Sequence, residues 1–268
     1  MQLLTEFHFN LNFVKSYNRK LKTVFLRDMK IGLIGYGKMG KAIERIAVER
    51  GHTIVYKVDS KNTIDQVDLK QADVAIEFTQ PGLVIQHIET CVEQQVPVVV
   101  GTTAWQDRLP YIATLVTEKG ASLLHASNFS IGVNILFNIN EKLAALMFPH
   151  PEYKARIEEI HHIQKLDAPS GTAVSLAQGI IQNNHTYTSW KSETGSWPAV
   201  TEHELPICAV REPDVPGTHT ISYTSKIDTL TLSHEAHSRD GFALGSVIAA
   251  EYLLGKKGVF TMRDVLAF

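Results

Sequence analysis

Three glycines at a fixed spacing constrain the fold of this chain more than any other feature. The segment Gly35-Tyr36-Gly37-Lys38-Met39-Gly40 follows the apolar run KIGLI directly and leads into the helical spacing of KAIERIAVER. In this context the first glycine permits a tight turn, the second lets the backbone approach a pyrophosphate, and the third lets a helix pack close to a strand. The segment therefore predicts a dinucleotide-binding loop, and a structural glycine turn is the alternative.

Short apolar runs alternate with amphipathic stretches over residues 29–127. HTIVYKVD, VAIEFT, PVVVGTT and SLLHAS follow the first run, and helical segments separate them. Continuous apolar strands joined by helices indicate a parallel sheet that is buried on both faces. We therefore predict an α/β fold whose first domain, residues 29–127, is a Rossmann-like doubly wound parallel sheet that binds a dinucleotide.

Asp59 ends the second apolar run, close to the offset of about 20 residues at which such folds place an acid. An acid there accepts hydrogen bonds from the ribose hydroxyls of the adenosine. The alternative is a solvated loop residue. Because strand, loop, helix and acid stand in order, we predict that Asp59 contacts the ribose.

Residues 128–240 differ from the first domain, because their strand-like runs alternate apolar and polar residues. THTISYTS and DTLTLSHEAH show this alternation, whereas NILFNINEKLAALM and GTAVSLAQGIIQ have helical spacing. Alternation predicts a sheet with one face toward solvent or ligand, and hence a second, mixed α/β domain. We expect the polar residues 183–204 to form a long loop. Residues 241–268 open with an apolar helix, which we expect to return to the first domain.

Residues 1–28 mix apolar and basic residues without sustained periodicity. We expect them to be an N-terminal appendage, because the first core element begins at Met29. MKIGLIGYGKMG also opens as dinucleotide-binding enzymes commonly do. The hypothesis that follows is that Met29 is the physiological start.

The charge balance argues against nucleic acid and membranes as partners. Lys and Arg number 26 and Asp and Glu 28, for a formal charge of −2, which gives no basic field. No apolar run approaches the roughly 18 residues of a membrane span. Cys91 and Cys208 are far apart and form no C-x-x-C pair, so neither a disulfide framework nor a thiolate metal site is indicated. We expect a cytoplasmic protein with a small-molecule partner.

Proton donors and a cation are concentrated in residues 159–173, EIHHIQKLDAPSGTA. A histidine transfers protons near neutral pH, and Lys165 adds a point charge and a second donor. Because adjacent strand residues point to opposite faces, a turn near His162 is needed before His161 and His162 can address one ligand. The alternative is that both histidines are surface or packing residues.

The end of this stretch predicts a cradle for a carboxylate. Pro169 biases Ala168 away from helix, Ser170 fits an N-cap, and Gly171 and Thr172 would then present unpaired backbone N–H groups. Such a site suits an anionic substrate that is reduced. A zinc site would need further ligands such as His234 and His237, but no cysteine cluster or H-E-x-x-H supports one, so we expect no metal.

Residues 161–173 read H-H-x-x-K-x-D-A-P-S-G-T-A and resemble the signature of the 4-hydroxy-tetrahydrodipicolinate reductase family. The resemblance extends to further segments, namely Phe78-Thr79-Gln80-Pro81, Gly101-Thr102-Thr103, residues 126–134 (ASNFSIGVN), Val215-Pro216-Gly217-Thr218 and Met262-Arg263-Asp264-Val265-Leu266. It implies a Rossmann domain, a mixed α/β substrate-binding and tetramerisation domain, and a homotetramer. It also implies reduction of a small cyclic dicarboxylate, the dipicolinate precursor, to tetrahydrodipicolinate by NADH or NADPH in diaminopimelate and lysine biosynthesis.

By matching positions, the resemblance implies that His161 is the proton donor and Lys165 the second donor. His162, Ser170, Gly171 and Thr172 would hold the substrate carboxylate. The residues that would line the cofactor are Gly35, Tyr36, Gly37, Lys38, Met39, Gly40, Asp59, Phe78, Gly101, Thr102, Thr103, Ala126, Ser127, Asn128 and Phe129.

Two departures from the family pattern bear on the cofactor. GYGKMG is one residue shorter than the common G-x-x-G-R-M-G, and Asp59 stands where a Glu is often found. Ser60 follows where an Arg can bind a 2′-phosphate. We expect NADH to be used at least as well as NADPH. The competing interpretations are another two-domain dehydrogenase, acting on an amino acid or sugar, and a non-catalytic nucleotide-sensing protein.

Overall fold

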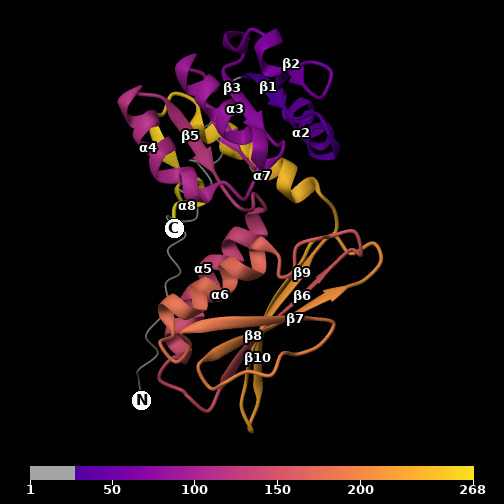
Figure 1. The fold of residues 1–268 in the computed structure, drawn as a ribbon, viewed down its shortest axis with the longest axis vertical. Helices are drawn as coiled ribbons and strands as arrows, with labels where there is room; N and C mark the ends of the chain where they lie inside the picture. The colour runs from indigo at the N-terminus through magenta and orange to yellow at the C-terminus, as the bar shows by residue number, and fades with distance from the viewer. Residues whose placement is uncertain (1–27) are drawn as a thin grey trace, which may run out of the picture.

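In the computed structural model, residues 28–268 are described, and the predicted N-terminal appendage falls almost wholly outside them. The chain forms two lobes, each built on one β-sheet (Figure 1). The first sheet has six strands in the order β11-β5-β4-β3-β1-β2, and every neighbouring pair is parallel. Its strands are β1 (Lys30–Ile34), β2 (Thr53–Val58), β3 (Val74–Glu77), β4 (Val98–Val100), β5 (Ser122–His125) and β11 (Gly258–Phe260).

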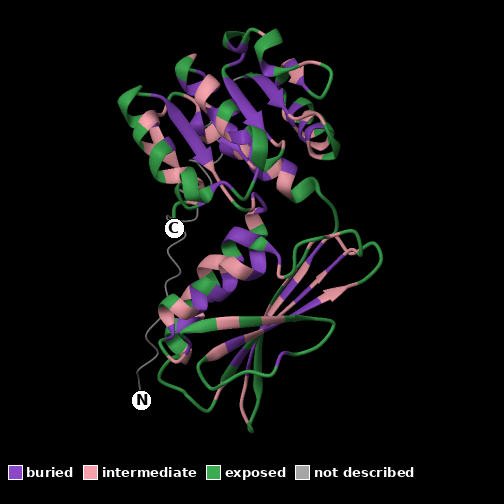
Figure 2. Ribbon diagram, viewed as in Figure 1, coloured by how far each residue is buried: buried purple, intermediate pink, exposed green. Residues whose placement is uncertain are grey.

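Helices cover both faces of the first sheet. Neighbouring residues of a strand face opposite cores: Leu33 packs in the core that contains residues of α2 and α7, and Ile34 in the core that contains residues of α3 and α4. β3 and β4 are accordingly buried throughout, and β1 is buried from Ile31 to Ile34 (Figure 2). The predicted doubly wound sheet is confirmed. Its helices are α2 (Lys38–Glu49), α3 (Pro81–Glu93), α4 (Leu109–Glu118), α7 (Asp240–Leu253), α8 (Met262–Leu266) and the short 3-10 turns η1 (Ile64–Gln66), η2 (Leu69–Gln71) and η3 (Gln106–Arg108).

The strand order reverses between β1 and β3, because the chain leaves β1 to form β2 on one side and then β3 on the other. In open α/β sheets the ligand crevice lies at such a point, beyond the carboxyl ends of the strands. Gly35 sits there with φ +100°, and a Cβ at this position would overlap the Phe78 carbonyl. The sequence KIGLIG therefore needs its second glycine for both backbone conformation and close approach.

The second lobe is a mixed sheet with helices on one face. Its order is β10-β9-β6-β8-β7, in which β6, β8 and β7 run parallel to one another, and β9 runs antiparallel to both of its neighbours, β6 and β10. Burial alternates along β6, and the buried residues pack beneath α5 and α6, which lie on one side of the sheet (Figure 1). The elements are α5 (Ile131–Met147), β6 (Lys154–His161), α6 (Gly171–Asn183), β7 (Ser189–Thr194), β8 (Glu204–Arg211), β9 (Thr218–Thr224) and β10 (Thr229–Glu235).

Two strands of this sheet differ from the sequence-based expectation. The expected loop over residues 183–204 contains β7, which lies at the edge of the sheet and pairs through its backbone with β8. An edge strand with mostly exposed side chains needs no apolar pattern, so its polar composition concealed it. β8 was not predicted at all, although it lies between β6 and β7.

The last segment joins the first lobe. Helix α7 packs on α2 and against β3 and β4, and β11 extends the parallel sheet beside β5. No helix among residues 28–268 is both long and apolar enough to span a membrane.

Candidate active site

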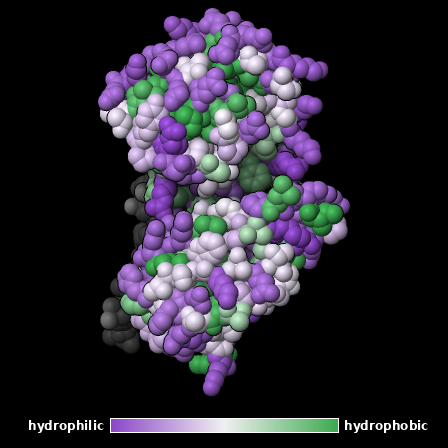
Figure 3. All heavy atoms as spheres, in the orientation of Figure 1, coloured by the Kyte–Doolittle hydropathy of each residue, from purple (hydrophilic) through white to green (hydrophobic). Residues whose placement is uncertain are grey.

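A cavity of about 1070 Å³ lies where the two lobes meet. Thr103 and residues 126–128 line it from the first lobe, and His161, Lys165 and residues 170–172 line it from the second. Figure 3 shows the surface hollowed between the lobes. A smaller cavity of about 190 Å³ adjoins it, and Ser127, Asn128 and His162 belong to the walls of both.

The glycine loop has the features required for an anion. Gly37 is the N-cap of α2 and has no side-chain capping bond, so N–H groups of the first helical turn are free to face a ligand. Among the described residues, no heavy atom lies within 4 Å of a Cβ built on Gly37, whereas a Cβ on Gly40 would overlap the Gly35 carbonyl. The loop is thus closely packed at Gly40 and open at Gly37, which leaves room for a bound pyrophosphate beside Gly37.

Within the described chain, some of the predicted cofactor residues line the two cavities and the rest do not. Met39, Phe78, Gly101 and Phe129 line the smaller cavity, where the Phe78 and Phe129 rings lie 5.7 Å apart. Thr103 and Ala126 line the larger one, and Ser127 and Asn128 line both. The other predicted residues lie outside these walls: Gly35, Tyr36, Gly37, Lys38, Gly40, Asp59 and Thr102.

Thr102 has a clear structural partner. Its hydroxyl accepts the Thr79 N–H at 2.7 Å, and its side chain is buried. Thr102 therefore joins the loops that follow β3 and β4, at the carboxyl edge of the sheet.

Asp59 follows β2 and is exposed. Its Oδ1 accepts the N–H groups of Lys61 at 2.7 Å and Asn62 at 3.1 Å, so this oxygen closes a turn. Lys57 forms an ion pair with Glu44 at 2.7 Å and lies 4.5 Å from the centre of the Tyr36 ring. The hydrogen bonds from Lys57 and Tyr36 lower the pKa of the Glu44 carboxyl. The cation nearest to Tyr36 is thus held by a carboxylate of α2.

The histidine pair lies at the end of β6, where the predicted turn forms. His161 is the last residue of the strand and is buried, and the Lys165 N–H donates to the His162 carbonyl at 3.0 Å. This turn brings both histidines to the cavities. The Lys165 ammonium also lines the larger cavity and is held by Asp167 at 2.8 Å.

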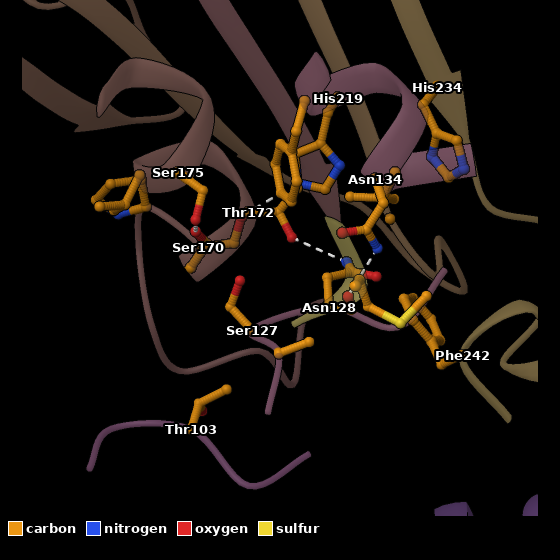
Figure 4. A pocket seen from close by; sticks show the side chains of 18 of the residues that line it. Thr103, Ser127, Asn128, Asn134, Ser170, Thr172, Ser175, His219, His234 and Phe242 are labelled. Atoms are coloured by element: carbon orange, nitrogen blue, oxygen red, sulfur yellow. Dashed lines mark hydrogen bonds between the residues drawn. The ribbon is translucent and has the colours of Figure 1, made fainter. Parts of the chain in front are cut away.

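The predicted carboxylate cradle forms at the start of α6. Ser170 is the N-cap, and its Oγ accepts the Ala173 N–H at 3.2 Å. Within residues 28–268 the N–H groups of Gly171 and Thr172 have no helical acceptor, because they precede the first complete turn. Asn128 donates to the Thr172 hydroxyl at 3.1 Å, so a residue assigned to the cofactor and one assigned to the substrate are in direct contact (Figure 4).

Several polar or charged residues in or beside these cavities were given no site role from the sequence. Glu159, Arg211, His219 and Arg239 are among them. His219 shares the alternation of buried residues along β9, so the period of THTISYTS already placed it on the buried face. Arg239 lines the smaller cavity directly before α7, and Arg211 ends β8; neither has a local sequence pattern that marks it.

One group of side chains has the geometry of a metal site. Donor atoms of Glu159, His161 and His219 lie within 4.8 Å of one another. However, Glu159 Oε1 already accepts the Ser170 N–H at 3.0 Å, and the Arg211 guanidinium lies 3.3 Å from the same oxygen. A metal cation would stand beside this fixed positive charge, so the group is better described as a buried carboxylate shared by an arginine and a histidine.

Comparisons with known proteins cover both lobes. The family model for the dihydrodipicolinate reductase N-terminus matches residues 29–129, and that for the C-terminus matches residues 132–266. A 4-hydroxy-tetrahydrodipicolinate reductase of Christiangramia forsetii is 47% identical over 241 residues, which are 89% of this chain and 98% of that protein. One from Neisseria meningitidis is 32% identical over 228 residues, or 83% of each chain. A dipicolinate-bound dihydrodipicolinate reductase from Paenisporosarcina has the same fold, with a TM-score of 0.70 at 23% identity over 87% of this chain and 97% of that one.

The open side of Gly37 gives a specific test of the glycine loop. We expect Gly37→Ala to weaken NADH binding by roughly 10-fold or more, because the methyl group would occupy the space that the pyrophosphate needs. Thermal stability should not change, since the added Cβ meets no described atom and φ at this residue is −85°. Isothermal titration with NADH measures the affinity. Gly82→Ala, an equally open position on α3, is the control, and equal affinities for the two variants would contradict the assignment.

Proposed function

The chain belongs to the dihydrodipicolinate reductase family, and we propose that it reduces 4-hydroxy-tetrahydrodipicolinate to tetrahydrodipicolinate with NADH or NADPH. This is a step of diaminopimelate and lysine biosynthesis. The single observation that carries the proposal is the cavity between the lobes. His161, Lys165 and the start of α6 line it from the second lobe, and the segments that follow β4 and β5 line it from the first lobe. A relative that is 47% identical over 98% of its length supports the same reaction.

The residues around the cavity supply what such a reduction needs besides hydride. When bound, the nicotinamide supplies the hydride. His161 and Lys165 hold protons at a ring nitrogen and at Nζ on the cavity wall, and are proposed as the proton donors. The backbone N–H groups of Gly171 and Thr172 suit a substrate carboxylate, with His162 beside them. Protein groups thereby orient the substrate and offset its charge.

We assign the cofactor to the glycine loop and to the walls of the smaller cavity. Gly37 leaves room for the pyrophosphate, and Phe78 and Phe129 offer apolar surface where the two cavities adjoin. His162 lies on the wall that both cavities share, so it separates the cofactor side from the substrate side. This arrangement supports residues 29–127 as the cofactor domain, residues 128–240 as the substrate domain, and residues 241–268 as a return to the first domain.

We further propose a cytoplasmic homotetramer. The sheet of the second lobe is covered by α5 and α6 on one face (Figure 1). By the alternation along β6, Lys154, Arg156 and Glu158 belong to the other face. Stacking of such faces between copies would cover them symmetrically. Light scattering should then give about four times the chain mass of 29.9 kDa. A monomer mass across a range of concentrations would contradict this assembly.

A coupled assay tests the reaction. Aspartate semialdehyde, pyruvate and the preceding synthase generate the substrate, and we expect NADH or NADPH to be oxidised only when this chain is added. His161→Ala should lower kcat by about 10²–10⁴-fold, the usual contribution of a positioned general acid, while NADH binding stays near normal.

Two outcomes of this assay would decide against the proposal. Cofactor binding without turnover by the wild-type chain would favour a nucleotide-sensing protein. Turnover of an amino acid or sugar instead of the coupled substrate would favour another dehydrogenase. Near-normal kcat in pure His161→Ala would leave the reaction in place but remove His161 from its role.

Asp59 provides a test of cofactor preference. We expect NADH to serve at least as well as NADPH, because a carboxylate accepts hydrogen bonds from ribose hydroxyls and repels a 2′-phosphate. Asp59→Ala should shift the kcat/KM ratio toward NADPH, and the shift should persist at two salt concentrations if direct hydrogen bonding dominates. Asp68→Ala, which also removes a carboxylate that caps a turn in this lobe, is the control. A wild-type preference for NADPH that Asp59→Ala leaves unaltered would show that Asp59 does not face the ribose.

A further inference from the structure

We propose that Glu159 is a positioning residue, which holds the His161 ring with Nδ1 toward the buried carboxylate and Nε2 toward the cavity. The inference rests on the proposed function, since it concerns the orientation of the proposed proton donor. Glu159 and His161 are two residues apart on β6 and therefore point to the same, helix-covered face of the sheet. His161 Nδ1 lies 3.2 Å from Glu159 Oε2.

The opposite side of the His161 ring faces open space. A Cβ built on Gly217 would lie 3.0 Å from His161 Nε2, and both residues line the larger cavity. Glycine at position 217 thus leaves Nε2 accessible. When the His161 ring is protonated on both nitrogens, a carboxylate that accepts Nδ1–H holds the ring so that Nε2–H is the proton aimed at the cavity.

The Glu159 carboxylate is fully buried, and its remaining contacts hold it in place. Oε1 accepts the Ser170 N–H at 3.0 Å, and the Arg211 guanidinium lies 3.3 Å away. Arg211 also donates to the Asp167 carbonyl at 2.7 Å. One carboxylate therefore connects the proton donor, the N-cap of the carboxylate cradle and the loop that contains Lys165.

The neighbouring histidine is unsuited to the same role. Burial, followed by the nearby His161, lowers the pKa of His219 to about 3, so this ring is neutral at physiological pH. Its Nε2 lies 3.1 Å from Ser170 Oγ, and its ring meets that of His161 edge-on with centroids 5.0 Å apart. Burial raises the pKa of Glu159, but the interactions with His161 and Ser170 outweigh it and lower the pKa to about 2. The carboxylate is thus charged and available to stabilise a protonated His161.

Other charged or titratable groups also lie around the His161 ring and contribute to the pH dependence of kcat/KM. They are Arg211 from β8, His219 from β9, His234 from β10, and His162, Lys165 and Asp167 from the loop after β6.

The test is Glu159→Gln, which keeps the size of the side chain and removes its charge. We expect kcat/KM for the substrate to fall by roughly tenfold, and the alkaline limb of its pH profile to move about one pH unit lower. The sign follows because His161 must be protonated to donate, and a neutral amide stabilises the imidazolium less than a carboxylate does. NADH affinity should not change. Glu158→Gln, at the preceding residue of β6 and on the opposite face of the sheet, should leave both kcat/KM and the pH profile unchanged.

A proton NMR measurement tests the contact independently of enzyme activity. A Nδ1–H that is shared with a carboxylate gives a strongly downfield signal, which we expect to be lost in His161→Gln and Glu159→Gln but kept in Glu158→Gln. Absence of the signal from the wild-type chain would overturn the proposal, as would a wild-type pH profile in folded Glu159→Gln. Failure of the proposed function is distinguishable, because it would abolish turnover by the wild-type chain and leave the NMR result intact.

Discussion

Burial of the first sheet on both faces is the constraint on which the site depends. Because helices cover β1, β3 and β4 on either side, polar side chains have no place along these strands and are found where the strands end. The parallel direction brings those ends to one edge. Gly35, Phe78, Gly101 and Ala126 therefore meet at one edge although they are far apart in sequence, and they form the first-lobe side of the junction.

The sheet of the second lobe differs from the first, because its helix-covered face contains charged or titratable side chains. The period of β6 places Glu159 and His161 on the same face as the apolar residues beneath α5 and α6. Burying an isolated carboxylate would be strongly unfavourable, and the contacts with Arg211 and the Ser170 N–H offset that cost. The Ser170 contact also fixes the start of α6. The interactions that stabilise the buried carboxylate therefore also shape the cavity wall.

The two lobes meet through polar contacts rather than through a continuous apolar core. Asn128 donates to Thr172 and accepts the Ser130 N–H at 2.8 Å, while Asn134 donates to the Asn128 carbonyl at 2.9 Å. These bonds place the segment after β5 against the start of α6 (Figure 4). A cofactor bound to the first lobe and a substrate held by the second would consequently face each other across the shared walls of the cavities.

Sequence alone determined the features that depend on near neighbours. The glycine loop, the apolar strands, the turn after His161 and the Ser170 N-cap each follow from residues within a few positions of one another, and all were predicted. The structure alone decided which distant groups meet: Arg211 reaches Glu159 from 52 residues away, and Arg239, directly before α7, joins residues of the first lobe on the wall of the smaller cavity. It also revealed the interior strand β8 and, beside it, the edge strand β7, whose pairing uses backbone hydrogen bonds that leave only a weak side-chain pattern. Local conformation is set by side-chain size, backbone freedom and hydrogen bonds within a few residues, whereas such long-range contacts depend on how the sheets are paired, which residue spacing does not specify.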